Sequence, residues 1–252
     1  MIMGLASKLN HFSPINLTQM DRVKLLSRTD TKYLISQAEL EDILVDLSTD
    51  YLILEIKGKR IASYHTNYLD THHRSYYSDH HQEKPKRHKV RFRTYLDSAL
   101  SFLEVKLKHK NKTNKKRMTS EPKDYMDEDQ KKFLSLWIPE NPIDLFICLE
   151  NSFQRITLVH KSAEERVTID LNIQFMNGQK KVKFKDQVII EIKQSYLNRF
   201  TLMSRLLRSR GIRTLRVSKY CVGSILLDPR LKYNRFKSRL LKINKINPIW
   251  NF

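Results

Sequence analysis

Apolar residues recur at helical intervals in some segments of the chain and at every second position over most of the rest. Ser36 and Glu39 have the spacing of a capping box, and the apolar residues that follow repeat with helical periodicity, so a helix is predicted over residues 36–48. From Tyr51 to Phe184 the dominant period is two, which is typical of strands. The pattern therefore predicts an α+β protein that is mainly antiparallel β.

Further elements follow from local signals. Three more helices are predicted: from the N-cap Ser13 and Pro14 through Leu25, over residues 124–137, and from Leu197 to Arg210 with Gly211 as the residue that ends it. Outside the long β region, strands are expected over Arg28–Ile35 and Val188–Lys193, with a last short strand containing Lys219. The lysine-rich segment His109–Arg117 is interpreted as a mobile loop between strands.

Charged side chains share one face of at least four of the expected strands. Lys89, Arg91 and Arg93 point to one side of their strand, while Val90 and Phe92 point to the other. The same alternation occurs in the segments Phe102–Lys110, Arg166–Asn172 and Val188–Lys193. Strand by strand, a half-exposed sheet with its charged face in water explains this. If the sheet closes, the charges line a lumen that must hold water and an anion, because unpaired buried charges carry large desolvation penalties.

The overall charge indicates the kind of partner. The 252 residues contain 47 Lys and Arg against 27 Asp and Glu, a net charge of +20, which favours a polyanionic ligand. Two cysteines, Cys148 and Cys221, fit a reducing compartment and exclude a disulfide framework or a thiolate zinc site. Because no apolar run is long enough for a signal peptide or a membrane span, we expect a cytoplasmic protein.

The C-terminal tail mixes seven basic residues with apolar ones from Arg230 onward. It is interpreted as an amphipathic helix, packed either on its own domain or on an anionic membrane surface. We therefore divide the chain into an N-terminal helical segment packed on the domain (residues 1–27), a β-tunnel domain (28–228) and a basic amphipathic tail (229–252).

Short motifs in a fixed order carry a resemblance to a known family. In chain order they are Arg28-x-Asp30-x-Lys32-Tyr33, Asn67-Tyr68-Leu69-Asp70-Thr71, Tyr76-Tyr77, Arg91-x-Arg93-x-Tyr95, Phe102-Leu103-Glu104-Val105-Lys106, Arg155-Ile156-Thr157, Glu165-Arg166-Val167-Thr168-Ile169-Asp170, Glu191-Ile192-Lys193 and Ser218-Lys219-Tyr220. Together they resemble the VTC domain of polyphosphate polymerases, within the triphosphate tunnel metalloenzyme superfamily that also contains CYTH-type triphosphatases. The resemblance covers most of the chain, from Arg28 to about Gly223.

This resemblance implies a closed antiparallel tunnel of about eight strands, with helices packed outside and a basic lining that binds nucleotide phosphates and polyphosphate. It implies Mg²⁺ or Mn²⁺ bound by Glu191, although from the sequence alone a salt bridge from Glu191 to a lumen cation is equally open. Arg91, Arg93 and Lys106 are expected to clamp the triphosphate, as catalytic residues together with Glu191. The remaining phosphate-binding positions are Arg28, Lys32, Arg155, Arg166, Lys193 and Lys219. A second basic residue after Lys106 is expected, with Lys116 or Arg117 preferred.

The expected activity is transfer of the ATP γ-phosphoryl group to inorganic polyphosphate, with release of ADP. The hydrolytic relatives carry a Glu-x-Glu-x-Lys strand, but here Arg28 and Asp30 occupy the two glutamate positions, which argues against a plain triphosphatase. Alternatives are a non-catalytic module that binds a nucleotide or another polyanion, and a tripolyphosphate hydrolase. The eukaryotic proteins of the family carry a phosphate-sensing module and membrane helices that are absent here, so association with a membrane would be peripheral, through a separate partner.

Two other interpretations are weaker. Nucleic-acid binding would suit the charge, but Arg and Lys alternate with aliphatic residues instead of clustering beside exposed aromatics, so no specific nucleic acid is expected. The pairs His72–His73 and His80–His81 could suggest a transition metal, but adjacent histidines on a strand point apart and those on a loop are usually solvated.

Overall fold

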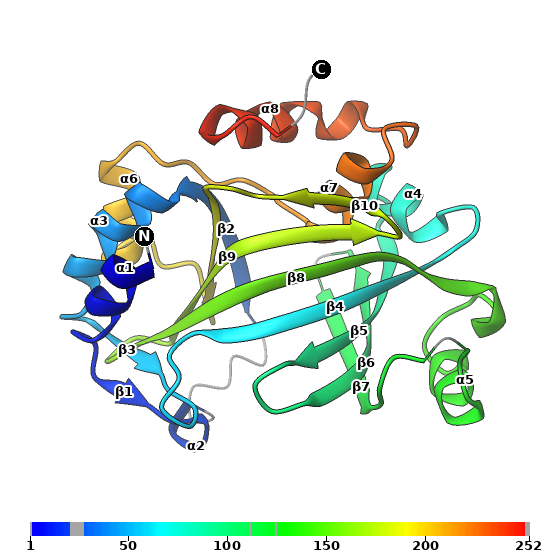
Figure 1. Cartoon of the computed structure of the whole chain (residues 1–252), viewed down its shortest axis with the longest axis horizontal. Coiled ribbons are helices and arrows are strands. Elements are labelled where there is room, and N and C mark those ends of the chain that lie inside the picture. Colours follow the sequence, from blue (N-terminus) through cyan, green and yellow to red (C-terminus); the bar gives the residue numbers. More distant parts are fainter. Residues whose placement is uncertain (1, 21–27, 111, 124, 250–252) are drawn as a thin grey trace.

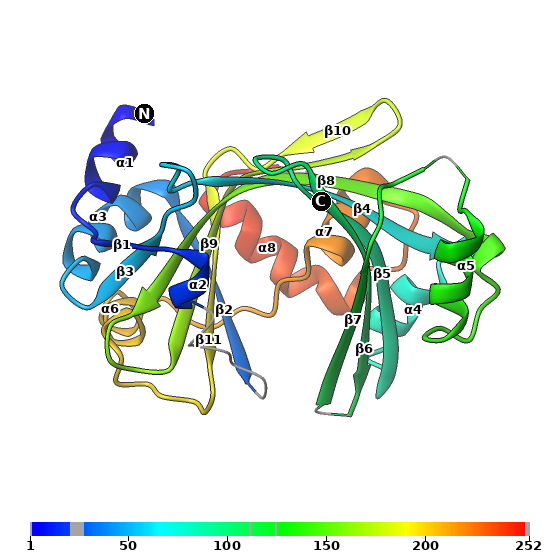
Figure 2. The same ribbon diagram turned by 90° about the horizontal axis from the view of Figure 1, so that it is seen from below.

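A single, mainly antiparallel sheet, bent into an arch, organises the protein (Figure 2). The computed structural model describes residues 2–20, 28–110, 112–123 and 125–249. The strand order is β2 (Thr29–Ser36), β11 (Gln187–Gln194), β9 (Glu165–Asn177), β8 (Leu145–His160), β4 (Ala62–Thr71), β5 (Lys86–Tyr95), β6 (Leu100–His109), β7 (Lys112–Thr119). Three short strands attach to this path. The strand β3 (Tyr51–Leu54) pairs with β8 and with β1 (Pro14–Ile15), and β10 (Lys180–Lys183) pairs with β9.

The arch has two walls and an open side. In Figure 2 the strands β2 and β11 form one wall, β5, β6 and β7 form the other, and β8 and β4 span the top. The expected closed tunnel is not found, because no pairing joins β2 to β7 among the described strands. Lys32 on β2 lies within electrostatic reach of Lys106 on β6 across the arch, and repulsion between these like charges opposes closure. The mainly antiparallel sheet and the α+β class are confirmed.

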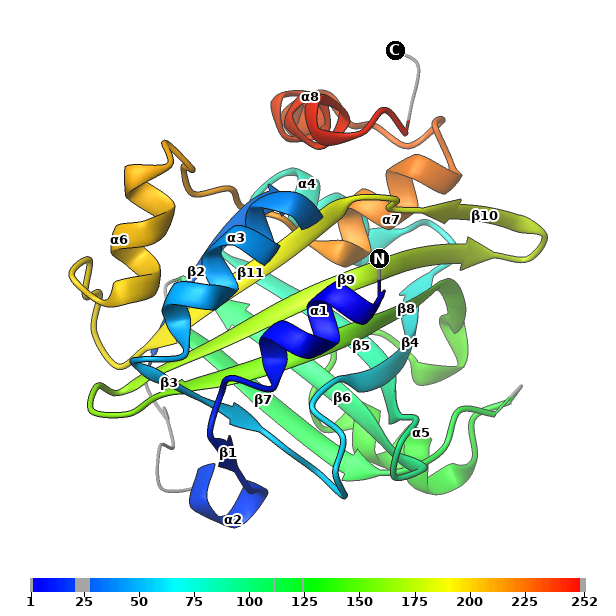
Figure 3. The same ribbon diagram turned by 60° about the vertical axis from the view of Figure 1, so that its left-hand side comes forward.

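Three helices cover the outer face of the β2 wall. The helix α3 (Gln37–Leu47) begins at the predicted capping box, in which Ser36 and Glu39 satisfy each other's backbone donors. Its apolar side packs on outward-facing residues of the sheet such as Ile190 and Ile169, all fully buried. The helices α1 (Ile2–Leu9) and α6 (Leu202–Ser209) complete this layer (Figure 3). The apolar faces of these strands therefore point outward to the helices, and the charged faces line the inside of the arch.

The other wall has its own cover. The helix α5 (Glu128–Ser135) lies over the outer face of β5 and β6, where Leu134 packs with Val90 and Phe92. A short 3₁₀ helix, Pro142–Asp144, follows α5 and leads into β8. The predicted helix over residues 124–137 is therefore confirmed in a shorter form.

The helix α7 (Lys219–Leu227) covers one end of the arch, where the sequence predicted a strand around Lys219. Tyr220, Cys221 and Ile225 pack with Phe153 and Phe175 of the sheet. The segment has no amphipathic period because nearly all of its residues are buried, and this made it resemble a strand.

The C-terminal tail forms α8 (Lys237–Ile246), which lies outside α7 (Figure 1). A short 3₁₀ helix, Asn234–Phe236, precedes it. The side chains of Phe236, Leu240 and Ile243 are buried in the same cluster as α7, so the apolar side of α8 packs on its own domain. No helix in the described part of the chain is both long and apolar enough to cross a membrane.

Two further predictions were wrong in detail. Where a helix was expected from Pro14 to Leu25, the structure has β1 and then the short helix α2 (Leu17–Met20), and residues 21–25 lie outside the described part. Where a loop was expected over His109–Arg117, β6 turns directly into β7. The residues of β7 (Lys112–Thr119) are mostly polar and do not alternate with apolar ones, so the sequence lacks the period of two that indicates a strand. The remaining helix, α4 (Ser75–His81), joins β4 to β5.

Candidate functional site

The inner face of the arch carries cations in successive rows. On β5 and β6, Lys89 lies opposite Lys106, and Arg91 lies opposite Glu104. On the other wall the rows contain both signs of charge. The cross-strand pairs there are Lys32 with Glu191, Asp30 with Lys193, and Arg166 with Lys193. Since cross-strand partners project from the same face, all of these side chains lie on the concave side.

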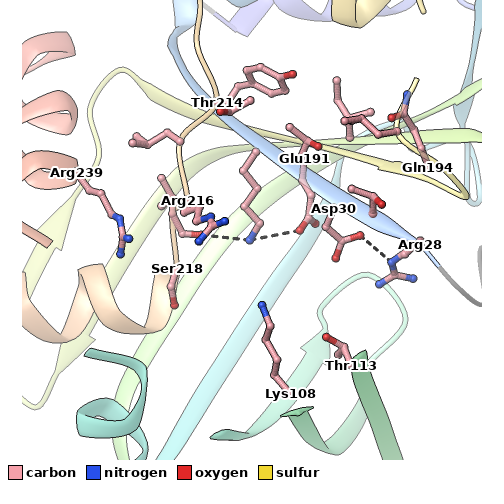
Figure 4. Close-up of a pocket in the computed structure, with 18 of the residues that line it drawn as sticks. Arg28, Asp30, Lys108, Thr113, Glu191, Gln194, Thr214, Arg216, Ser218 and Arg239 are labelled. Carbon is pink, nitrogen blue, oxygen red and sulfur yellow. Dashed lines mark hydrogen bonds and ion pairs between the residues drawn. The ribbon is translucent and has the colours of Figure 1, made fainter. Parts of the chain in front are cut away.

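A cleft of about 1140 Å³ lies between the walls. Its lining includes twelve basic side chains and three acidic ones, from both walls, from the segment between α6 and α7, and from α8 (Figure 4). The basic ones are Arg28, Lys32, Arg87, Lys89, Lys106, Lys108, Lys110, Arg199, Arg208, Arg213, Arg216 and Arg239. The predicted residues Arg28, Lys32, Lys106 and Glu191 therefore line one cavity, whereas the other predicted residues lie outside this lining, in the groups described next.

Glu191 is held between two lysines. Its Oε1 lies 3.3 Å from Lys32 Nζ, and its Oε2 accepts a hydrogen bond from Lys193 Nζ. Burial alone would raise the pKa of Glu191, but Lys32 and Lys193 outweigh it and hold the pKa well below the usual value. Glu191 is therefore ionised. It forms the salt bridge to a cation of the inner face that the sequence left open beside the role of metal ligand.

Asp170 of β9 joins Arg155 of β8 to Lys219 at the start of α7. Arg155 donates Nε and Nη2 to the two carboxylate oxygens at 2.6 and 2.8 Å, and Lys219 Nζ also donates to Asp170. Asp170 is only 3% exposed. Burial lowers the pKa of Lys219 to about 8 although Asp170 opposes that shift. Asp170 thus positions two of the predicted cations, and sequence reasoning missed this because the contact depends on strand register.

On the opposite wall, Glu104 has the same role. It accepts from Arg91 Nε at 2.8 Å and pairs with Lys115 of β7. Burial would raise the pKa of Glu104, but Arg91 and Lys115 lower it to about 2. Lys115 is thus a second basic residue after Lys106 on the inner face.

The two residues preferred from the sequence point to opposite faces of β7. Lys116 lies opposite Val105 and over Trp137 on the outer side, so of the two alternatives it is the one that does not reach the inner face. Arg117 lies opposite Glu104, on the inner face, and stacks over Phe102.

Arg93 is a buried cation of the inner face with one donor left unpaired. It is 7% exposed, its guanidinium lies 5.6 Å from the ring centroids of Tyr64 and Phe153, and its buried Nε has no hydrogen-bond partner among the described residues. Burial and the neighbouring Arg91 lower its pKa to about 10. Arg155 stacks on the same two rings at 5.2 Å. A buried donor without a protein partner can be satisfied by water or by a ligand, and an anion suits a guanidinium group.

Lys89 was not among the predicted site residues, although its alternation with Arg91 and Arg93 was the available signal. Its Nζ donates to Ser218 Oγ at 2.9 Å, next to the start of α7. Burial lowers its pKa to about 7, and the positive charges of Lys32 and Lys106 add to the effect. An anion between the walls would restore the charge of Lys89.

The acidic residues near the cleft limit how a metal is held. No group of three or more His, Cys, Asp or Glu side chains suited to a metal occurs among the described residues, and this includes the histidine pairs. Glu191 and Asp30 are diagonal neighbours on adjacent strands of the inner face. Mg²⁺ is commonly held by one or two carboxylates and by substrate phosphates, so this donor set fits such an ion.

These features define a class of protein in which the cationic concave face of an antiparallel sheet is suited to a chain of phosphates. The chain belongs to the VTC domain family, whose sequence profile matches residues 27–227. The family resemblance stated from the motifs is thereby confirmed.

Solved structures are similar to the chain at low sequence identity. A Bacillus halodurans protein, provisionally described as an adenylate cyclase, is similar with a TM-score of 0.50 and 14% identity, over 75% of this chain and 92% of that chain. A provisional adenylyl cyclase from Hippeastrum, described as having a dominant triphosphatase activity, gives a TM-score of 0.49 and 16% identity, over 78% and 95%. A Pyrococcus horikoshii protein gives a TM-score of 0.45 and 14% identity, over 81% of this chain and 100% of that chain. No curated protein sequence matches the chain.

Proposed function

We propose that the protein is a metal-dependent phosphotransferase that moves the γ-phosphoryl group of ATP onto the end of an inorganic polyphosphate chain in the cytoplasm and releases ADP. The observation that carries this proposal is the excess of cations facing each other across one cleft, together with the unpaired Nε of Arg93 elsewhere on the same inner face. Such an arrangement lacks counter-charge by itself, and a chain of phosphates supplies it along its whole length.

The proposed roles follow from position. Arg91, Arg93 and Lys106 on one wall clamp the triphosphate. Mg²⁺ or Mn²⁺ held at Glu191, when bound, supplies positive charge to the phosphate oxygens. The other wall and its neighbours bind further phosphates, through the residues Arg28, Lys32, Arg155, Arg166, Lys193 and Lys219. The pull of one polyanion on both walls would draw β2 and β7 together and complete the tunnel.

The chemistry is in-line transfer. A terminal oxygen of the acceptor chain forms a bond to the γ-phosphorus, while the bond from that phosphorus to the bridging β–γ oxygen breaks and its electron pair leaves with ADP. The acceptor oxygen is already anionic, so no side chain has to remove a proton. Positioning of the two phosphate chains and stabilisation of developing charge by Arg91 and Arg93 lower the barrier.

One contact at the start of β2 favours transfer over hydrolysis. Asp30 Oδ1 accepts a hydrogen bond from Arg28 Nε at 2.9 Å, so this carboxylate is neutralised by the residue that replaces a glutamate of the hydrolytic relatives. Because Arg28 occupies this oxygen of Asp30, the oxygen does not orient an attacking water. The strand therefore offers phosphate a cation where the hydrolases have an acidic pair.

The test is incubation of the purified protein with ATP and Mn²⁺, scored for ADP, inorganic phosphate and long polymer. Transfer predicts ADP and polymer in step. The variants Arg93→Ala and Glu191→Gln should lower ADP release by about a hundredfold or more while the far-UV spectrum is unchanged. The control Lys180→Gln, on an exposed strand away from the cleft, should retain full activity.

The other outcomes are distinct. Phosphate release without polymer would identify a hydrolase, and saturable binding of polyphosphate without any turnover would identify a binding module. Either result would overturn the transferase proposal, and so would full turnover in both variants.

A further inference from the structure

The cationic surface continues beyond the residues that match the family motifs. On the inner face of the second wall, Arg87 lies opposite Lys108, one step further out than the pair of Lys89 and Lys106. Pairs two residues apart along a strand are separated by about 7 Å, so this outer row lies about 13 Å from the row of Arg91. The cleft therefore presents a graded series of cation pairs toward its rim.

Two arginines from elsewhere in the chain face this outer row. Arg216 comes from the segment between α6 and α7, and Arg239 comes from α8, and both line the cleft together with Lys108 (Figure 4). We call Arg87, Lys108, Arg216 and Arg239 the rim cluster. It brings together cations from four separate parts of the chain.

The rim cluster has too little negative charge around it. Glu83 is its only acidic neighbour in the described cleft lining. It pairs with Arg239 at 3.2 Å and is half exposed. The side chains of Lys108 and Arg216 form no hydrogen bond or ion pair with any other residue that the structure describes. Burial lowers the pKa of Lys108, and the charges of Arg87 and Arg216 lower it further, so these cations lie within electrostatic reach of one another.

We propose that the rim cluster binds a second stretch of polyphosphate, several residues of the chain away from the reacting end, and so holds the acceptor as it grows. This inference rests on the proposed function, because it needs a polyphosphate chain in the cleft. Tripolyphosphate is too short to reach from the row of Arg91 to the rim, whereas a long chain contacts both. The rim therefore gives the protein a preference for long chains over short ones.

The experiment compares affinities for long-chain polyphosphate and for tripolyphosphate by calorimetry, without nucleotide. The double variant Lys108→Gln and Arg216→Gln removes two cations that have no partner in the described structure. The matched control, Lys180→Gln and Lys181→Gln, removes the same charge from an exposed hairpin. All proteins are first checked for an unchanged melting temperature.

The rim variant should bind long-chain polyphosphate about tenfold more weakly, since charge-assisted contacts at a partly exposed site are lost. It should bind tripolyphosphate within about twofold of the wild type, because the row of Arg91 lies about 13 Å from the rim and tripolyphosphate held there meets the rim only through its screened field. The salt dependence of long-chain binding should also become shallower. The control pair should change neither affinity. If the double variant does not fold, Lys108→Gln alone should reduce long-chain affinity about threefold.

An equal loss of affinity for long-chain polyphosphate and for tripolyphosphate would overturn the proposal, because it would show that the rim acts only through the overall positive potential and does not contact the chain. Unchanged long-chain affinity, or a wild type with no preference for long chains, would also overturn it. Since no turnover is measured, absence of ADP release would count against the phosphotransferase and leave this result intact.

Discussion

Replacing Asp170 by Asn should destabilise the unliganded protein strongly. The side chain is 3% exposed and is the shared counter-ion of Arg155 and Lys219. Asparagine has nearly the same shape but no charge, so both cations are left buried without compensation. Breaking a buried ion pair by removing one partner costs about 3–5 kcal/mol. For a chain of this length the melting temperature should fall by roughly 10 °C.

The assay is urea unfolding followed by circular dichroism, with Asp144→Asn as the matched control. Asp144 is exposed in a short 3₁₀ helix, so its replacement should change the free energy of unfolding by less than about 0.5 kcal/mol. Tripolyphosphate should stabilise Asp170→Asn more than it stabilises the wild type, because the added anion compensates the same two cations.

A loss of less than about 1 kcal/mol in Asp170→Asn would refute this reasoning, since it would mean that Arg155 and Lys219 reach solvent. A loss of the expected size that tripolyphosphate does not reduce would show that the two cations are structural only.

Two other perturbations test the electrostatics and the packing. Lys89 has a pKa near 7 in the folded protein and about 10.4 when unfolded, so the unfolded state binds more protons between these values and stability should rise with pH across that window. In Lys89→Met the free energy of unfolding, measured with urea, should increase by about 1 kcal/mol less between pH 7 and pH 9 than it does in the wild type. An identical increase in both proteins would contradict the low pKa of Lys89. Gly223→Ala would place a methyl group 2.4 Å from the Phe175 ring, so unfolding should become easier by about 1–3 kcal/mol; unchanged stability would mean that α7 is seated differently.

The faces of the strands could be predicted from the sequence, because alternation fixes which side chains share a side. Lys89, Arg91 and Arg93 were placed together in this way, and the capping box at Ser36 and the left-handed Gly211 are also local signals that the structure confirms. Family motifs added the positions on separate strands.

The pairing between distant residues could not be predicted in the same way. Asp170 meets Lys219 only because α7 is packed into one end of the arch, and Glu104 meets Lys115 only because β7 continues the sheet. Both elements have atypical patterns, since α7 is buried on nearly all sides and β7 is rich in lysine. The openness of the sheet depends on the balance of charge between two walls, which no local pattern reports.

The most direct test of the account is a crystal structure of the protein with tripolyphosphate and Mn²⁺. We expect phosphate oxygens within hydrogen-bonding distance of cations on both walls, with Arg93 Nε donating to one of them and the metal at Glu191. A tripolyphosphate bound on the outer surface, or held by one wall alone with Arg93 still unpaired, would contradict the claim that the two walls act on the same chain of phosphates.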